Sequence, residues 1–294
     1  MAFPLPPATP WRPSLFLRLS AALHGLALLA MLAWPSQWPV WLGWVVANHV
    51  ILATAGLWPR SRLLGSNLTR LPPEAAARGE VALTFDDGPD PLVTPQVLAQ
   101  LDAAGARATF FCVGDQLRRH PDLARDIVRR GHHIENHTDT HPNLFAAMGW
   151  RRMAQQVAGG QAAVEAVTGR APRFFRAVAG LRNPWLDPIL ARQGLRLAAW
   201  TRRGYDTRTG DAEAVYQRLT RGLAASNHRL SHAAAEWKSD LTRRLGAAQV
   251  ELKWTFGFDD DVLLTVVPWS ALTRVLRELV SNVIAHAQAR HLEI

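Results

Sequence analysis

Two long apolar stretches near the start of the chain constrain its fold more than any other feature. "LFLRLSAALHGLALLAMLAW" covers residues 15–34, and "WPVWLGWVVANHVILATAGL" covers residues 38–57. Each stretch has about the 20 residues that an α-helix needs to cross the hydrocarbon core of a bilayer. A cleaved signal peptide would explain the first stretch alone, whereas a hairpin of two spans explains both. The sequence therefore predicts a transmembrane hairpin over residues 15–58.

Charge around the hairpin predicts its orientation. The flanking arginines are Arg12, Arg18, Arg60, Arg62 and Arg70. Under the positive-inside rule, they place the tail over residues 1–14 and the soluble part on the cytoplasmic side of a bacterial inner membrane. The whole chain carries a net charge of +9, but its arginines form no basic run. This scatter does not favour a nucleic-acid partner and leaves anionic lipid head groups or a phosphorylated substrate as candidates.

After a linker over residues 59–79, short apolar runs alternate with helical patterns. The runs "VALTFDD", "ATFFCVG" and "HHIENH" predict strands, and residues 94–104 and 121–130 predict helices. This alternation predicts a parallel α/β sheet or barrel, in which the chemistry gathers where strands end and loops begin. The single cysteine, Cys112, lies within an apolar run. We expect it to be a buried core thiol and not a nucleophile.

Two aspartates stand side by side at the end of the first predicted strand. Asp86 and Asp87 are followed at once by Gly88 and Pro89. Neighbouring side chains point to opposite faces within a regular strand, so the pair can converge only because the chain turns there. Two carboxylates in one pocket repel each other unless a cation or a proton is shared between them. We therefore expect a cation, or its ligands, elsewhere in the sequence.

The segment "HTDTH" supplies two candidate ligands. His137 and His141 are four residues apart, so both imidazoles would project from one face if this loop enters a helical turn. The spacing alone fits a polar helix start equally well, and the nearby carboxylate pair favours a metal site. One aspartate and two histidines form a facial triad with open positions, which suits a divalent ion that activates water. The other aspartate is then free to take a proton.

Four motifs follow one another across this region. They are "VALTFDDGPDPLVTPQVLAQL", "ARATFFCVG", "HPDLARDIVRRGHHIENHTDTHPN" and "RFFRAVAG". Their order and spacing resemble those of polysaccharide deacetylases of the NodB-homology type, also called carbohydrate esterase family 4, over about residues 80–223. The resemblance implies a distorted (β/α) barrel over residues 80–225. It also implies a metal-dependent hydrolase that deacetylates a carbohydrate or a lipid-linked sugar.

The resemblance also implies roles for individual residues. It makes Asp86 the general base. The implied ligands of a divalent ion, often zinc, are Asp87, His137 and His141. Arg176 matches the arginine that pairs with the catalytic aspartate in the family, and Asp206, in "WTRRGYDT", matches the residue that orients a catalytic histidine.

The family pattern is lost after residue 223. Family members continue into a last apolar strand that ends in Leu-His-Asp, and that histidine protonates the leaving amine. Here the segment "SNHRLSHAAAEWKSDLTRRLG" is polar and helical in period, so we expect His232 to be an exposed helix residue. The sequence thus predicts a barrel without its last strand. Loss of a general acid typically costs about 10²- to 10⁴-fold in rate.

A different pattern covers residues 226–294. It predicts a helix, two strands and a long helix whose polar stripe consists of Glu278, Asn282 and His286. "RELVSNVIAHAQA" resembles the N-box of sensor histidine kinases, in a partial α/β-sandwich ATPase-like segment over about residues 236–294. That likeness implies Mg-ATP at these three residues. The glycine-rich boxes of the nucleotide lid do not follow, so we expect no kinase activity. The alternative to deacetylation is a weakly active fusion that binds a nucleotide or a partner through this segment.

Overall fold

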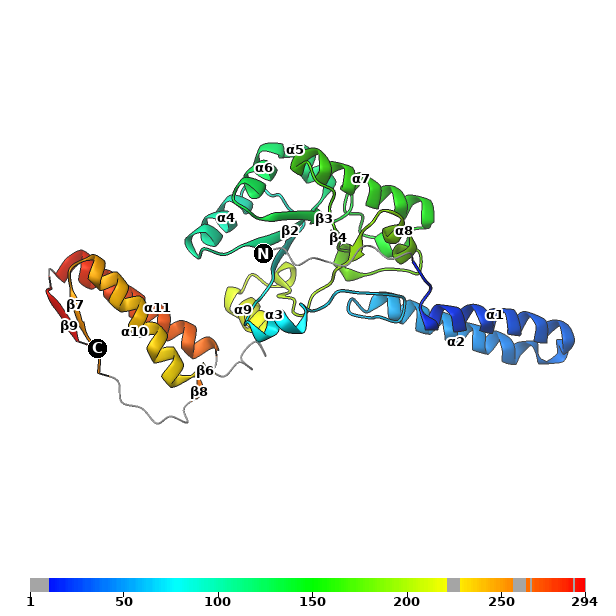
Figure 1. Ribbon diagram of the computed structural model, residues 1–294. Helices are drawn as coiled ribbons and strands as arrows, with labels where there is room; N and C mark the ends of the chain where they lie inside the picture. Colours follow the sequence, from blue (N-terminus) through cyan, green and yellow to red (C-terminus); the bar gives the residue numbers. More distant parts are fainter. Residues whose placement is uncertain (1–10, 221–227, 256–262, 265, 288, 294) are drawn as a thin grey trace. The chain divides into compact units, whose positions relative to one another are not determined.

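The computed structural model describes residues 11–220, 228–255, 263–264, 266–287 and 289–293. It divides into two compact units, Met1–Thr201 and Arg202–Ile294 (Figure 1). The first unit contains a helical hairpin and a parallel sheet. The second contains two small sheets and the helices that accompany them.

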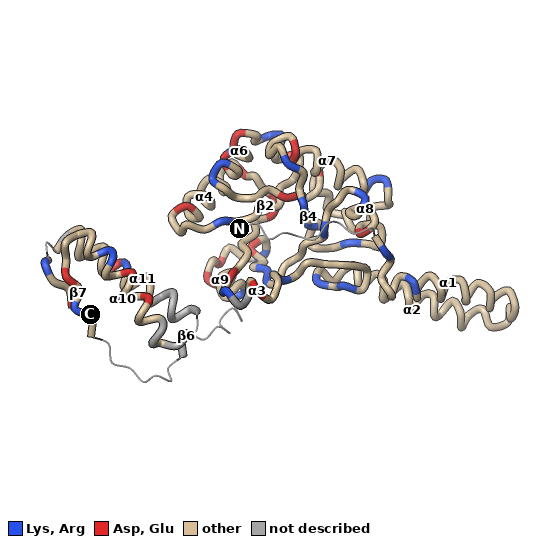
Figure 2. The backbone as a smooth tube through the Cα atoms, viewed as in Figure 1, with Lys and Arg blue, Asp and Glu red and all other residues tan. Residues whose placement is uncertain are grey.

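The N-terminal hairpin consists of α1, Leu15–Ala33, and α2, Trp38–Leu57. Both helices are long and apolar enough to cross a membrane by length and composition. Arg18 is the only Lys, Arg, Asp or Glu within them, and Figure 2 shows the pair as an almost uniformly uncharged hairpin. Between the helices, the buried amide of Asn48 donates a 2.7 Å hydrogen bond to the hydroxyl of Ser20. This bond satisfies polar groups that would be costly to leave unpaired in an apolar surrounding.

The chain that follows α2 packs tightly against the rest of the first unit. The backbone N–H of Arg182 donates a 3.0 Å bond to the carbonyl of Gly56. A Cβ at Gly56 would lie 2.2 Å from the Arg182 carbonyl oxygen, so only glycine allows this approach. The buried Arg182 guanidinium pairs with Asp187 and donates 2.8 Å to the carbonyl of Ser61. Leu64, in the same connection, is fully buried.

Five parallel strands form the sheet of the first unit, in the order β1-β2-β3-β4-β5. Their bounds are Leu83–Asp86, Ala108–Cys112, His133–Asn136, Phe174–Phe175 and Arg196–Leu197. The predicted parallel α/β sheet is therefore confirmed. Leu68 adds an isolated parallel bridge to Ala198 beside β5. Within the described residues, no strand joins β1 to β5, and the sheet stays open.

Helices cover one face of this sheet. They are α4, Thr94–Ala103; α5, Gly114–Arg119; α6, Pro121–Arg129; α7, Trp150–Thr168; and α8, Leu186–Arg192, with a short α3, Pro73–Ala77, before β1. On β2, Phe110 and Cys112 join the buried cluster that also contains Leu98 and Ile127 from α4 and α6. Phe111, between them, points to the other face because side chains alternate along a strand. The helix-facing side of the sheet is thus the apolar core, and the opposite side is left for polar groups.

The strand register places the carboxyl side chains of Asp86 and Glu135 on that opposite side, with Phe111 between them. Asp86 is aligned with Phe111, and Phe111 with Glu135. Glu135 accepts two 2.7 Å hydrogen bonds, from the backbone N–H groups of Arg173 and Phe174. It therefore joins β3 to the start of β4. Burial raises the pKa of Glu135 to about 7, although these two bonds act in the opposite direction.

The second unit has its own small core. Its helices are α9, Ala212–Thr220; α10, Leu230–Ala247; and α11, Val266–Asn282, which runs into a π-helical turn, Val283–Ala287. Strand β7, Glu251–Lys253, pairs in parallel with β9, His291–Glu293, and β6, His228–Arg229, pairs antiparallel with β8, Leu263–Leu264. The order helix, two strands, long helix agrees with the sequence prediction, and the short strands β6 and β9 are additions to it. The predicted joint near Ala225 lies outside the described residues.

The apolar side of α11 is only partly covered. Leu272, Val275 and Leu279 are exposed, and so is Ile284 in the turn that follows the helix. The core that α11 shares with α10 and the β7–β9 pair takes up only Leu276 and Val280. These neighbours cover only a narrow strip of the helix. An apolar pattern in the sequence therefore suggests more buried residues on α11 than the structure contains.

We predict that Glu135 makes the first unit less stable at alkaline pH. The folded state holds the carboxyl proton more tightly than an unfolded chain, in which the pKa is 4.5. The stabilisation is therefore complete below about pH 4.5 and is lost as the pH rises through about 7, with an upper limit of about 3 kcal/mol. Glu135→Gln should raise the thermal unfolding midpoint of the full chain at pH 8 and reduce its change between pH 5 and pH 8. Glu165→Gln, at an exposed position on α7, is the control, and an unchanged pH dependence in Glu135→Gln would refute this role.

Candidate active site

Arg176 holds Asp86 at the carboxyl end of the sheet. Its Nη1 lies 2.6 Å from Asp86 Oδ1 and 2.8 Å from the hydroxyl oxygen of Thr84. The same guanidinium donates 3.3 Å bonds to the carbonyls of Ala198 and Ala199. Only 3% of the Arg176 side chain is exposed, against 21% for Asp86. A buried arginine this close fixes the orientation of the aspartate.

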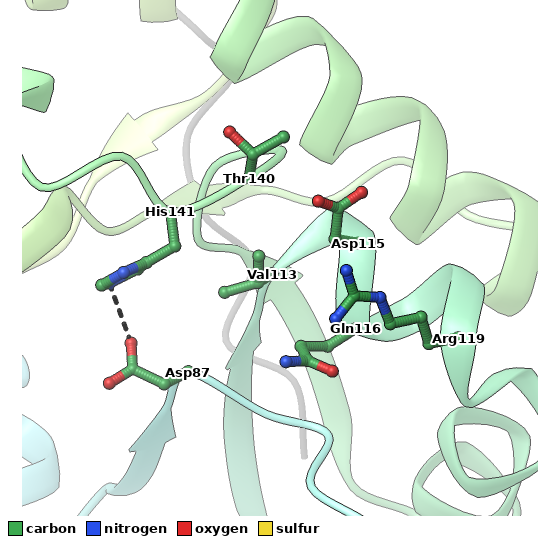
Figure 3. A pocket seen from close by; sticks show the side chains of 7 residues that line it. All are labelled: Asp87, Val113, Asp115, Gln116, Arg119, Thr140 and His141. Atoms are coloured by element: carbon green, nitrogen blue, oxygen red, sulfur yellow. Dashed lines mark ion pairs between the residues drawn. The ribbon is translucent and has the colours of Figure 1, made fainter.

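Asp87 turns away from this pair. Its φ of 70° lies in the left-handed region, which breaks the alternation of the strand and costs about 1–2 kcal/mol for a residue with a side chain. Its Oδ1 lies 3.1 Å from Nε2 of His137 and 3.1 Å from Nε2 of His141. Figure 3 shows the contact with His141. Hydrogen bonds to His137 and then His141 hold the pKa of Asp87 well below its usual range, and the bond to Asp87 raises the pKa of His141.

The two histidines meet without the helical turn that the sequence analysis considered. The segment between them is not helical; Thr138 and His141 have φ of 73° and 53°. Side chains hold this conformation, because Asn136 Oδ1 accepts from the Thr138 N–H at 2.9 Å and Thr138 Oγ1 accepts from the His141 N–H at 3.0 Å. The imidazole centroids end up 5.1 Å apart. The two rings therefore converge without a helical turn.

Glycines in α7 let this loop approach the helix, and the sequence analysis missed them. A Cβ at Gly160 would lie 2.3 Å from Asn136 Oδ1, and one at Gly159 would lie 2.5 Å from the Asp139 carboxyl carbon. Larger residues would therefore push the loop away. The sequence does contain a sign of this close approach, namely the Gly-Gly pair inside an otherwise helical stretch. Glycine lowers the stability of a helix, so its presence there usually has a packing or functional reason.

The residues Asp87, His137 and His141 fit a divalent metal ion. One ligand atom from each lies within 4.8 Å of the others, close enough for a single ion at about 2 Å from each. His137 Nδ1 lies 2.8 Å from the carbonyl oxygen of Arg176. A carbonyl only accepts, so Nδ1 is the donor in this contact, and Nε2 is the ring atom that faces the Asp87 carboxylate. This second hydrogen bond of the ring, made by Nδ1, is typical of metal-binding histidines.

A cavity of about 320 Å³ opens beside this ligand set. It is lined by Asp87, Val113, Asp115, Gln116, Arg119, Thr140 and His141 (Figure 3). The residues from α5 had not been singled out in the sequence, because nothing in "GDQLRR" marks it as adjacent to the two catalytic motifs. Only the register of β2 beside β1 and β3 brings the start of this helix to the site.

The remaining predicted residues lie elsewhere. Cys112 is fully buried, and burial raises the pKa of its thiol, so it is a core residue as predicted. Asp206 begins a 3₁₀ turn, Asp206–Arg208, in the second unit. His232 lies within helix α10 and not on a strand. The roles predicted for these residues rest on the sequence.

The predicted nucleotide residues lie near the end of α11. Glu278 and Asn282 are exposed on the helix, whereas His286 falls in the π-helical turn that follows. The regular spacing that predicted one continuous polar stripe therefore stops at Asn282. A cavity beside it is lined by Asn282 and by the apolar Leu279, Val283 and Ala287.

Comparison with known proteins places residues 74–198 in a family described as polysaccharide deacetylase. A chitooligosaccharide deacetylase from Sinorhizobium fredii is 38% identical over 138 residues, which are 46% of this chain and 62% of that protein. A peptidoglycan-N-acetylglucosamine deacetylase from Bacillus cereus is 30% identical over 176 residues, which are 59% of this chain and 81% of that protein. The structure of a family 4 carbohydrate esterase from Streptomyces lividans in complex with acetate is 33% identical, with 49% of this chain and 73% of that chain covered and a TM-score of 0.46. The chain spans between 36% and 62% of the length of four curated relatives that it matches.

We predict that His137→Ala removes a bound divalent ion. Zinc affinity of the metal-stripped full chain should fall by at least about 100-fold, because one of three protein ligands is lost and the remaining pair is left unpositioned. Titration calorimetry with zinc measures this directly. His133→Ala is the matched control, since His133 begins β3, the strand that ends just before His137, but is exposed and lies outside the ligand set. Equal zinc affinity in the two variants would contradict the assignment.

Proposed function

Because the chain belongs to the polysaccharide deacetylase family, we propose that it hydrolyses an N-acetyl or similar acyl group on a carbohydrate. One observation carries this proposal: Asp86, which Arg176 contacts at 2.6 Å, directly precedes Asp87, which meets His137 and His141. A base and a metal-ligand set therefore adjoin at the end of β1. This arrangement suits the hydrolysis of an amide.

In our proposal, each residue of the site has a separate role. Asp87, His137 and His141 hold a divalent ion, which we propose to be zinc. When bound, the ion polarises the acyl carbonyl and lowers the pKa of the attacking water. Asp86 takes the proton of that water at its carboxylate. Arg176 keeps this carboxylate oriented and, through its backbone carbonyl, fixes the ring of His137 with Nε2 toward the ion.

The leaving amine also needs a proton. The family's histidine for this step belongs to a last strand that the motifs of this chain do not reproduce. We therefore propose a slow enzyme, whose rate lies about 10²- to 10⁴-fold below that of a relative with the complete pair of base and acid. Asp206, in the second unit, would then have no catalytic histidine to orient.

We predict that Asp86→Asn abolishes acetate release from a chito-oligosaccharide. Asparagine keeps the shape and can still accept from Arg176, but it cannot take a proton, so the rate should fall by at least about 100-fold. Release is measured with zinc-loaded full chain and an enzymatic acetate assay. Asp122→Asn is the control, because that aspartate is 95% exposed on α6. The proposed reaction would be contradicted if Asp86→Asn released acetate as fast as the wild type, or if the zinc-loaded wild type released no acetate.

We also propose that α1 and α2 anchor the chain in a bacterial inner membrane, with the catalytic unit on the cytoplasmic side. Their length, apolar composition and nearly uncharged surface support an anchor, and the flanking arginines support the orientation. The substrate is then a carbohydrate or a lipid-linked sugar within reach of that side.

Thiol labelling tests this topology, because the only cysteine, Cys112, is buried. A membrane-impermeant reagent should label Ser36→Cys, in the exposed turn between the helices, in intact cells. It should label Arg125→Cys on α6 only after the cells are opened. The reverse pattern would place the catalytic unit outside, and recovery of the chain in the soluble fraction would exclude the anchor.

Nucleotide or partner binding by Glu278, Asn282 and His286 stays a prediction of the sequence. Among the described residues that line the cavity beside Asn282, none is a cation that could meet a phosphate. Deacetylation is therefore the function that we favour.

A further inference from the structure

One wall of the cavity beside the metal-ligand set is formed by helix α5. Gln116 and Arg119 both line it (Figure 3). The two are three residues apart, so they lie on one face of the helix. Asp87 and His141 line the same cavity. A substrate whose acyl group is held at Asp87 and His141 would therefore extend past Gln116 and Arg119.

The two arginines that end α5 differ in their partners. Arg118 is committed to the protein, because its Nη2 lies 2.6 Å from Asp115 Oδ1 and 2.6 Å from Asp139 Oδ1. Arg119 makes no hydrogen bond or ion pair with any residue that the structure describes. Asp115 also lines the cavity and shares the guanidinium of Arg118 with Asp139. Arg119 is thus the one arginine of the cavity lining, and its guanidinium has no ion-pair partner among the described residues.

We propose that Arg119 makes this cavity selective for a sugar that carries an anionic group, a carboxylate or a phosphate, beside the acylated position. This inference rests on the proposed function and names its substrate class. The planar guanidinium can donate two parallel hydrogen bonds to either anion, and such charge-assisted bonds are about twice as strong as neutral ones. A sugar hydroxyl offers no charge, so a neutral oligosaccharide gains less from this wall.

Matched substrates distinguish the sources of the anion. Acetate release by the zinc-loaded full chain is compared on a neutral chito-oligosaccharide, on the same oligosaccharide with a reducing-end phosphate, and on one in which a carboxylate is attached to the adjoining sugar. We expect kcat/KM to be higher on at least one anionic substrate than on the neutral one. Arg119→Gln should lower this anionic-to-neutral ratio by about tenfold, mainly through KM. The preference of the wild type should also weaken at high salt.

The matched control is Arg125→Gln. It removes the same charge from an exposed arginine on α6 that is paired only with Asp122, so the ratio should stay at the wild-type value. The inference is overturned if Arg119→Gln and Arg125→Gln give equal ratios, or if the wild type prefers the neutral substrate.

A binding measurement separates this inference from the proposed reaction. Calorimetry with Asp86→Asn compares the affinities for the neutral and the anionic oligosaccharides without turnover. If Asp86→Asn binds the anionic oligosaccharide more tightly and the added substitution Arg119→Gln removes this preference, the inference is supported. This holds even if the wild type releases no acetate, a result that would overturn only the proposed reaction. Acetate release together with equal affinities for the two substrate types would leave the reaction standing and overturn the inference.

Discussion

The buried guanidinium of Arg176 is the interaction on which the site depends. It reaches Thr84 and Asp86 at the end of β1 and the carbonyls of Ala198 and Ala199 beyond β5. The ring of Phe111 on β2 lies 3.9 Å from its guanidinium carbon. A charge this deeply buried is tolerated only when it is paired and its donors are satisfied. The contacts that satisfy Arg176 therefore also hold the carboxyl ends of β1, β2 and β5 in one arrangement.

The two adjacent aspartates avoid each other by taking different partners. Asp86 keeps its strand orientation and meets Arg176, whereas the left-handed backbone of Asp87 sends that carboxylate to His137 and His141. Arg176 takes part on both sides, because its carbonyl also accepts from His137 at 2.8 Å. The base and the metal-ligand set are thus coupled through one residue. A change at Arg176 would disturb the position of the Asp86 carboxyl group and the ring orientation of His137 together.

Much of the fold and of the site could be predicted from short-range patterns. The strands that end at Asp86 and Cys112 belong to apolar runs, and such runs can be recognised in the sequence without any knowledge of their neighbours. The loop between His137 and His141 could not be predicted in the same way. Its conformation depends on hydrogen bonds from the side chains of neighbouring residues and on room left by glycines of α7, which follow later in the chain. The exposed apolar face of α11 shows the same limit, because burial requires a covering neighbour.

By itself, the sequence determined which residue types meet at the ends of the strands. A carboxylate pair followed by Gly88, two histidines four apart and a later arginine indicate water activation by a metal and a base, because these groups have few other uses in combination. The motif resemblance already implied different partners for the two aspartates, and only the tertiary structure showed the left-handed backbone at Asp87 that separates them. It also decided that Arg119 lies in the cavity wall. Such choices depend on strand register and backbone direction, which place side chains far apart in sequence within a few ångströms of one another.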